Sequence, residues 1–272
     1  MDSRRHSKEA SSSIRIKGIP LPSEHGAWGF LAEPLVAALA IAWSGAGAWI
    51  ALMVVGAFLS RQPLKIFLGD TLSGRRLPQT NVARRFALIF ILISSLGFAG
   101  TTFNGRMDSL WPFSVVLPFA LIQIYFDAKR QSRELVAEVI GAFAMSSSAA
   151  AILLADGQSV FNAIALWAVF FMRLVTSIIY VRNRLRAEKG KKFSFITPLS
   201  AHLFAGALVV SLSYLEAIPF LIGVAFILLL VRSTLGLSNL RKPTRAMKIG
   251  MLEVLYGALL VIAVIVGSYL GW

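Results

Sequence analysis

The 272-residue chain contains no cysteine. This absence excludes a disulfide framework, a thiolate nucleophile and a cysteine-ligated metal. Charged residues are also scarce, at 15% against 57% apolar residues, whereas about a quarter of the residues of a soluble domain are charged. The sequence shows no glycine-rich phosphate loop, no internal repeat and no separate soluble domain. Residues 1–20 lack the apolar segment of a signal peptide, so we expect the first apolar stretch to act as an uncleaved signal.

What the sequence does contain is long apolar blocks. They are roughly 17–25 residues long, the length at which a helix crosses about 30 Å of hydrocarbon. We therefore predict an all-α membrane protein with nine transmembrane helices, preceded by a disordered basic cytoplasmic tail over residues 1–22 and forming one domain over residues 23–272. The predicted spans are 26–43, 48–68, 86–100, 110–126, 135–154, 160–181, 196–214, 218–232 and 251–270.

The basic residues are unevenly distributed between these spans. All of the 27 Lys and Arg residues except Arg106 and Arg173 fall in the tail and in alternate loops. Basic loops stay on the cytoplasmic side of a membrane, so this alternation predicts a cytoplasmic N-terminus and an external C-terminus. The net charge of +14 therefore indicates orientation and contact with anionic lipid rather than a nucleic-acid partner.

A few ionisable residues fall inside the predicted spans, where they are costly and usually face the interior. They are Glu33, Glu138, Arg173, His202 and Glu253. Arg173 needs an acidic partner or an anionic ligand; Glu138 and Glu33 are the candidate partners. The spacing of Arg173, Ser177, Tyr180 and Arg184 places these four residues on one face of a helix.

The first span opens with the stretch PSEHGAWGFLAEP, which carries Glu24, His25 and Glu33. Pro34 frees the carbonyl of Phe30 from its helical bond and so creates a polar position. Two interpretations of Glu33 remain open: it balances a buried arginine, or it bonds to a neighbouring hydroxyl. His202 is either a hydrogen-bonded packing residue or a ligand. No histidine or glutamate pair has metal-ligand spacing, so we expect no metal and no other cofactor.

Two basic clusters are candidate phosphate-binding sites. Arg61 and Lys65 lie at the end of the second span and share a face if the helix continues through Pro63. Lys129, Arg130 and Arg133 lie in a short loop that opens the fifth span, where guanidinium groups and a helix N-terminus both favour phosphate oxygens.

Three of these elements together resemble the YwiC-like family of bacterial membrane proteins. They are the SEHGAWGFLAEP opening, the RQP after the second span and the YVRNR after the sixth, and the resemblance extends over residues 20–272. More distantly, the chain is similar to the UbiA superfamily of intramembrane prenyltransferases. The superfamily has a conserved element between its fourth and fifth helices, which Tyr125, Lys129, Arg130, Ser132 and Gly141 match, with Ser132 in place of Thr. The resemblance implies a nine-helix fold and a role for Lys129 and Arg130 in holding an isoprenoid diphosphate.

The chain departs from that superfamily in two loops where prenyltransferases carry Asp-rich magnesium motifs. Only Asp70 remains in the loop after the second span, and only Glu188 in the loop after the sixth. Because basic residues replace the other carboxylates, we expect direct binding of an anion without Mg²⁺.

We therefore expect a cytoplasm-facing pocket for an anionic, amphipathic lipid, such as an isoprenoid or phospholipid-like molecule. Its expected polar partners are Glu24, His25, Glu33 and His202, and no catalytic residue can be assigned. Three classes stay open: a transferase acting on a lipid phosphate, a transporter, and a non-catalytic membrane factor. The expected rim consists of Arg61, Lys65, Lys129, Arg130, Arg173, Tyr180, Arg182 and Arg184.

Overall fold

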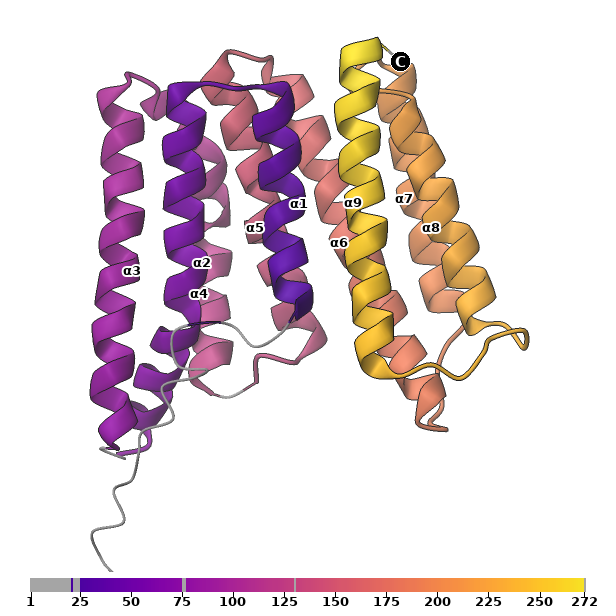
Figure 1. Ribbon diagram of the computed structural model, residues 1–272, viewed down its shortest axis with the longest axis horizontal. Coiled ribbons are helices and arrows are strands. Elements are labelled where there is room, and N and C mark those ends of the chain that lie inside the picture. Colours follow the sequence, from indigo (N-terminus) through magenta and orange to yellow (C-terminus); the bar gives the residue numbers. More distant parts are fainter. Residues whose placement is uncertain (1–20, 22–24, 75–76, 130, 272) are drawn as a thin grey trace, which may run out of the picture.

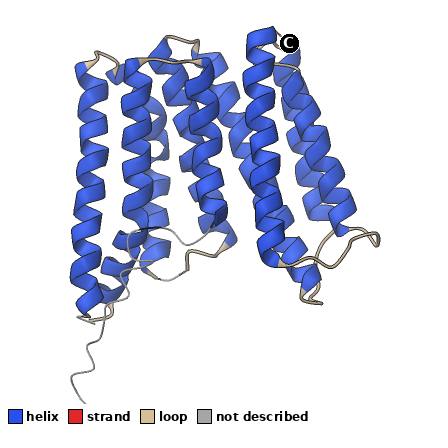
Figure 2. Ribbon diagram, viewed as in Figure 1, coloured by secondary structure: helices blue, strands red, loops and turns tan. Residues whose placement is uncertain are grey.

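The computed structural model describes residues 21, 25–74, 77–129 and 131–271, and within these residues all regular structure is helical (Figure 2). The predicted disordered tail, apart from Leu21, lies outside the described residues. The helices, in chain order, are α1 (His25–Ile41), α2 (Gly45–Leu72), α3 (Pro78–Phe103), the 3-10 helix η1 (Met107–Leu110), α4 (Trp111–Ala128), α5 (Leu135–Asp156), α6 (Val160–Glu188), α7 (Ile196–Tyr214), α8 (Leu221–Leu237) and α9 (Ala246–Leu270).

Successive helices run in opposite directions (Figure 1). The start of α1 and the turns after α2, α4, α6 and α8 lie at one end of the bundle, and the other turns and the C-terminus lie at the opposite end. The first group contains the loops that the charge pattern predicts to be basic. We call this end the basic end and the opposite end the far end.

Seven of the described helices are long and apolar enough to cross a membrane, with η1 and α4 counted together as one. The remaining two, α1 and α8, are apolar but have only 17 residues each. The chain is therefore a multi-pass membrane protein, and a full count of nine spans stays a prediction.

Several helices extend further toward the basic end than the apolar blocks predict. For example, α2 continues to Leu72, α6 to Glu188 and α8 to Leu237. The predicted spans end close to charged residues, whereas Arg, Lys, Gln and Leu are all good helix formers and continue the helix. As a result, Arg232 lies within α8 rather than at its end, and Arg61 lies well inside α2.

Small residues bring the central helices close together. Helix α5 contacts α1, α2, α4 and α6, and its residues from Ser146 to Ala155 are buried without interruption. Helix α2 packs against α3 at Gly56 and Gly97, where an added Cβ would overlap the backbone of the facing helix. Close approach through small residues is the usual way in which helices associate in lipid, where burial of apolar surface gives no driving force.

Candidate functional site

Glu33 lies in the interior of the bundle, at the contact between α1 and α9. It is only 5% exposed, and Gly257 of α9 faces its carboxylate. A Cβ at position 257 would overlap the side chain of Glu33, so the missing side chain of this glycine gives the carboxylate its space. The α1–α9 contact thereby directs Glu33 toward α6.

Arg173 of α6 is the partner of Glu33. Its side chain is fully buried, and its Nε lies 3.5 Å from Glu33 Oε2, although neither of these atoms makes a hydrogen bond. The rest of the guanidinium group binds Glu253 of α9: Nη1 donates to Oε2 at 3.4 Å and Nη2 to the backbone carbonyl at 2.9 Å. The interpretation of Glu33 as the counter-ion of a buried arginine is therefore confirmed. Glu138, the other candidate, pairs with Arg182 instead.

Glu253 connects this pair to α8 and, through Arg232, to α7. Ser177 of α6 donates a 2.5 Å hydrogen bond to its Oε2, and Arg232 of α8 donates to its Oε1. Arg232 Nη2 also lies 3.3 Å from Nε2 of His202 in α7. Because His202 Nδ1 bonds to the Pro198 carbonyl at 2.7 Å, it carries the proton and Nε2 accepts from Arg232. His202 is therefore a hydrogen-bonded packing residue.

We call these six residues the buried ion network: Glu33, Arg173, Ser177, His202, Arg232 and Glu253. Its two arginines balance its two glutamates, and it links α1 with α6, α7, α8 and α9. Paired charges of this kind are tolerated at membrane depth, whereas a single unpaired charge there is costly.

Sequence analysis missed two important residues, Arg232 and Asp127. Arg232 stood at the predicted end of the eighth span and was counted with the basic loop that follows. The leucines at positions 235 and 237 were the available signal that this helix continues. Asp127 stands two residues before Lys129 at the end of α4, and its acidic side chain among basic residues was the available signal for an ion pair.

The expected rim residues Arg61 and Lys65 lie on α2, beside a cavity of about 390 Å³ that α4 and α5 also line. Arg61 forms a bidentate salt bridge with Asp127 of α4: Nε donates to Oδ2 at 2.7 Å and Nη2 donates to Oδ1 at 3.1 Å. Lys65 donates a 2.5 Å hydrogen bond to Ser132. The helix does continue through Pro63, so these two basic side chains lie at the same cavity.

Tyr180 and Arg184 lie elsewhere, on the α6 face that also carries Arg173. The four residues that the spacing placed on one face are all buried there. Arg184 donates to the carbonyls of Gly236 and Lys242 and pairs with Glu188 at 2.8 Å. It therefore joins α6 to the turn between α8 and α9. Together with Arg232, Tyr180 and Arg184 line a small cavity of about 70 Å³.

The remaining rim residues that the structure describes line neither of these two cavities. Arg182 pairs with Glu138 at 2.9 Å, and each side chain is about a third exposed. Lys129 lies over the ring of Tyr125, 4.5 Å from its centre. Arg130 and Glu24 lie outside the described residues, as does the side chain of His25. The described residues of the expected rim thus occupy separate places instead of surrounding one pocket. A helical spacing defines a face of one helix but not the helix that this face meets.

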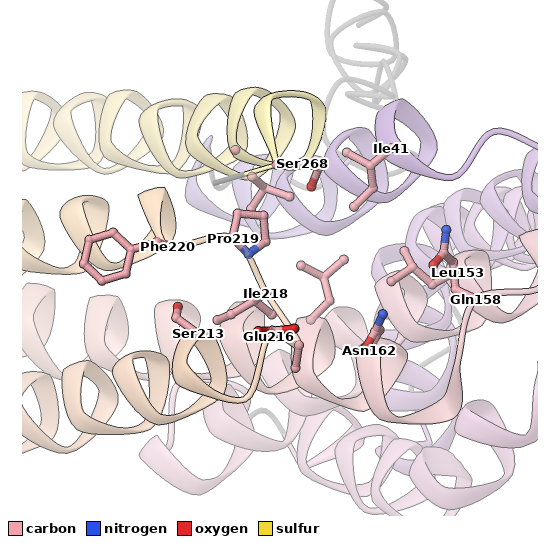
Figure 3. A pocket seen from close by; sticks show the side chains of 15 residues that line it. Ile41, Leu153, Gln158, Asn162, Ser213, Glu216, Ile218, Pro219, Phe220 and Ser268 are labelled. Carbon is pink, nitrogen blue, oxygen red and sulfur yellow. The ribbon is translucent and has the colours of Figure 1, made fainter.

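A cavity of about 630 Å³ lies at the far end, between the ends of α1, α5, α6, α7 and α9 and the turn before α8 (Figure 3). Its lining includes one charged side chain, Glu216, and no Lys or Arg. Its charge does not suit the anionic ligand that the sequence predicts. The α2–α4–α5 cavity does suit such a ligand, because it has basic side chains at one side and apolar walls.

Comparison with known families gives one result. Residues 21–153 match the family model described as YwiC-like protein. This stretch of the chain is similar to that family. Neither the curated proteins nor the solved structures include a match to the chain.

The YwiC-like stretch runs from the start of α1 nearly to the end of α5. It contains the SEHGAWGFLAEP opening and the RQP element, whereas the YVRNR element and the rest of the wider predicted resemblance lie beyond it. The α2–α4–α5 cavity is built from YwiC-like residues throughout. The buried ion network, by contrast, draws only Glu33 from this stretch.

Proposed function

We propose that the protein is a cytoplasmic-membrane protein that binds an anionic, phosphate-bearing lipid in the α2–α4–α5 cavity. The basic end then faces the cytoplasm, with the nine helices in the predicted N-in, C-out arrangement. One observation carries the proposal: Arg61 and Lys65 lie together at a cavity of about 390 Å³ whose other walls are largely apolar. An anionic head group and an apolar chain would each meet the surface that suits it.

The charges at this cavity favour an anion. Arg61 and Lys65 supply two positive charges and Asp127 removes one, so a single positive charge remains. The pair with Asp127 uses Nε and Nη2 of Arg61, which leaves Nη1 free to donate to a phosphate oxygen. Lys65 has two further N–H donors besides the one that binds Ser132.

The apolar part of the cavity fits a lipid chain. Its walls include Leu31, Phe58 and Met145 from three different helices. Leu117 and Ile124 of α4 also line it and are 58% and 37% exposed, so the cavity lies next to the lipid-facing surface of α4. A chain could enter sideways from the bilayer while its head stays with Arg61 and Lys65.

Such binding is shared by the three classes that the sequence left open. In a UbiA-like transferase the ligand would be an isoprenoid diphosphate held directly by basic residues. Asp70 accepts hydrogen bonds from Thr80 and Gln79, and Glu188 pairs with Arg184, so these carboxylates are already engaged. Analysis of products after incubation with an isoprenoid diphosphate and an acceptor lipid would separate a transferase from a transporter or a non-catalytic factor.

The test of binding starts with native mass spectrometry of the purified protein, which identifies any lipid it retains. The affinity for that lipid, or for an isoprenoid diphosphate, should be the same in EDTA as in Mg²⁺. Lys65→Ala removes a charge-assisted donor without leaving a carboxylate unpaired and should weaken binding by about tenfold or more. The double change of Arg61 and Asp127 to Ala removes the other basic group together with its partner and should also weaken binding.

Arg85→Ala is the control, because Arg85 is exposed on α3 and does not line the cavity. It should leave the affinity unchanged. A strict requirement for Mg²⁺, or full affinity in both cavity variants, would contradict the proposal.

A further inference from the structure

The far-end cavity brings together polar side chains from several elements (Figure 3). Asn162 comes from α6, Ser213 from α7, Glu216 from the turn after α7, and Ser268 from α9. Gln158, in the turn before α6, completes the polar lining. These residues are distant in sequence, and the bundle places them around one space of about 630 Å³.

Most of these groups lack a partner within the described part of the chain. Among the described residues, the side chains of Asn162, Glu216 and Ser268 make no hydrogen bond or ion pair, and the buried Oγ of Ser213 makes none either. Gln158 reaches only Asp156, at 3.5 Å. Asn162 is half-buried, whereas Gln158, Glu216 and Ser268 are exposed. The buried Ser213 hydroxyl is a different case, because buried polar groups are almost always paired, with water or a ligand where no protein group is available. The cavity therefore offers hydrogen-bonding groups to a molecule that enters it.

The charge at the cavity selects the sign of that molecule. Glu216 is its single charged lining residue, and the Asp156 carboxylate lies next to Gln158. Glu216 has φ of 56° at the end of α7, where the amide of Ala217 reaches back to the carbonyl of Leu212. Glycine is the usual residue at this position of a helix end, so a glutamate there is unusual. The carboxylate favours a cation and disfavours an anion.

The other side of the cavity is apolar. Leu166, Ile218, Phe220 and Val264 supply this surface. The cavity lies where the helices end, which is the level of the lipid head groups if the helices cross the bilayer. A ligand here would therefore combine a cationic, hydrogen-bonding head with a short apolar part.

We propose that the far-end cavity binds a primary ammonium group carried on an apolar chain, either a free alkylamine or the head group of an aminophospholipid. An ammonium group has three N–H donors and no acceptor. The Glu216 carboxylate, the Asn162 amide oxygen and the Ser213 hydroxyl are the acceptors that it would meet. This site is separate from the α2–α4–α5 cavity, so either proposal can fail alone.

The first experiment compares three probes of equal chain length with the purified protein: hexylamine, hexanol and hexanoate. Titration calorimetry or a shift in thermal unfolding should show that hexylamine binds best and hexanoate worst. Glu216→Gln keeps the size of the side chain and should weaken hexylamine binding about tenfold, the usual effect of losing one charge-assisted hydrogen bond. Because Glu216 has no partner among the described residues, this variant should melt near the wild-type temperature.

Asp108→Asn is the matched control, since Asp108 is an exposed far-end carboxylate outside the cavity. It should bind hexylamine as the wild type does. Equal hexylamine affinity in Glu216→Gln and the wild type, or hexanoate binding as tight as hexylamine binding, would overturn the proposal.

A second experiment identifies the source of the ammonium group. Native mass spectrometry from nanodiscs of mixed phosphatidylethanolamine and phosphatidylglycerol should show enrichment of the aminophospholipid in the wild type but not in Glu216→Gln. Enrichment would identify the lipid head group as the ligand. Hexylamine binding without enrichment would identify a free amine.

Discussion

Arg173 and Arg182, both on α6, show how depth decides what an ion pair contributes. Arg173 is fully buried and contacts two carboxylates, Glu33 and Glu253. Arg182 and Glu138 form a shorter pair, but both side chains are about a third exposed. Water and salt screen the exposed pair, so its contribution is small. Removing one partner of the buried pair leaves charges without compensation.

This contrast gives a prediction at the residue scale. Arg173→Ala should lower the free energy of unfolding by about 3–5 kcal/mol, because Glu33 then loses its partner and Glu253 keeps one positively charged partner, Arg232, instead of two. Arg182→Ala should lower it by less than about 1 kcal/mol. Chemical unfolding in detergent, followed by circular dichroism, measures both values. Equal losses in the two variants would show that the buried ion network does not stabilise the bundle.

The same residues show what could be predicted from the sequence. Glu33 and Arg173 stood out because each is a lone charge in an apolar block. Charges at membrane depth usually form pairs with one another. Arg232 and Asp127 were missed because both lie near block ends, where a charge can equally belong to a loop. The sequence predicted one basic pocket, but the structure places the described rim residues at separate positions. Sequence spacing cannot tell which helix a given face will contact.

At the scale of elements, the pairing of α2 with α3 depends on glycines whose role the sequence did not reveal. Gly97 of α3 meets the backbone of Met53, and Gly56 of α2 meets that of Ser94, so the two helices approach closely at both points. Small residues are common in apolar helices, so their presence does not identify the helix that packs against them. The contact becomes visible only when both helices are placed side by side.

Gly97→Ala should therefore separate α2 from α3. The new Cβ would fall on the backbone of Met53, which cannot move as a side chain can, and overpacking of this kind costs about 1–3 kcal/mol. Gly206→Ala in α7 is the control, because a Cβ there meets nothing within 4 Å. It should be neutral or stabilise the helix by up to about 1 kcal/mol. Thermal unfolding of the two variants in the same detergent tests this, and a stabilised Gly97→Ala would contradict the close α2–α3 contact.

At the scale of the whole molecule, the two ends of the bundle differ in charge. The turns after α2, α4, α6 and α8 share one end (Figure 1), as the alternation of basic loops predicts. The far end holds a cavity whose one charged lining residue is acidic. The alternation was predictable because each loop's charge is local sequence information. The far-end cavity was not, because its lining comes from five helices and their turns.

The polarity of charge predicts the orientation of the bundle in the membrane. Loops rich in Lys and Arg are retained on the cytoplasmic side, so reporter fusions after residues 75, 130, 188 and 242 should report cytoplasm. Fusions after residues 105, 156 and 216 and at the C-terminus should report the outside. The short helices α1 and α8 are tested by different fusions, since a helix that does not cross inverts every later position. The fusion after residue 75 tests α1, and the fusions after residues 216 and 242 test α8. A cytoplasmic C-terminus would show that the number of spans is even and would remove the basis for placing Arg61 and Lys65 near the cytoplasm.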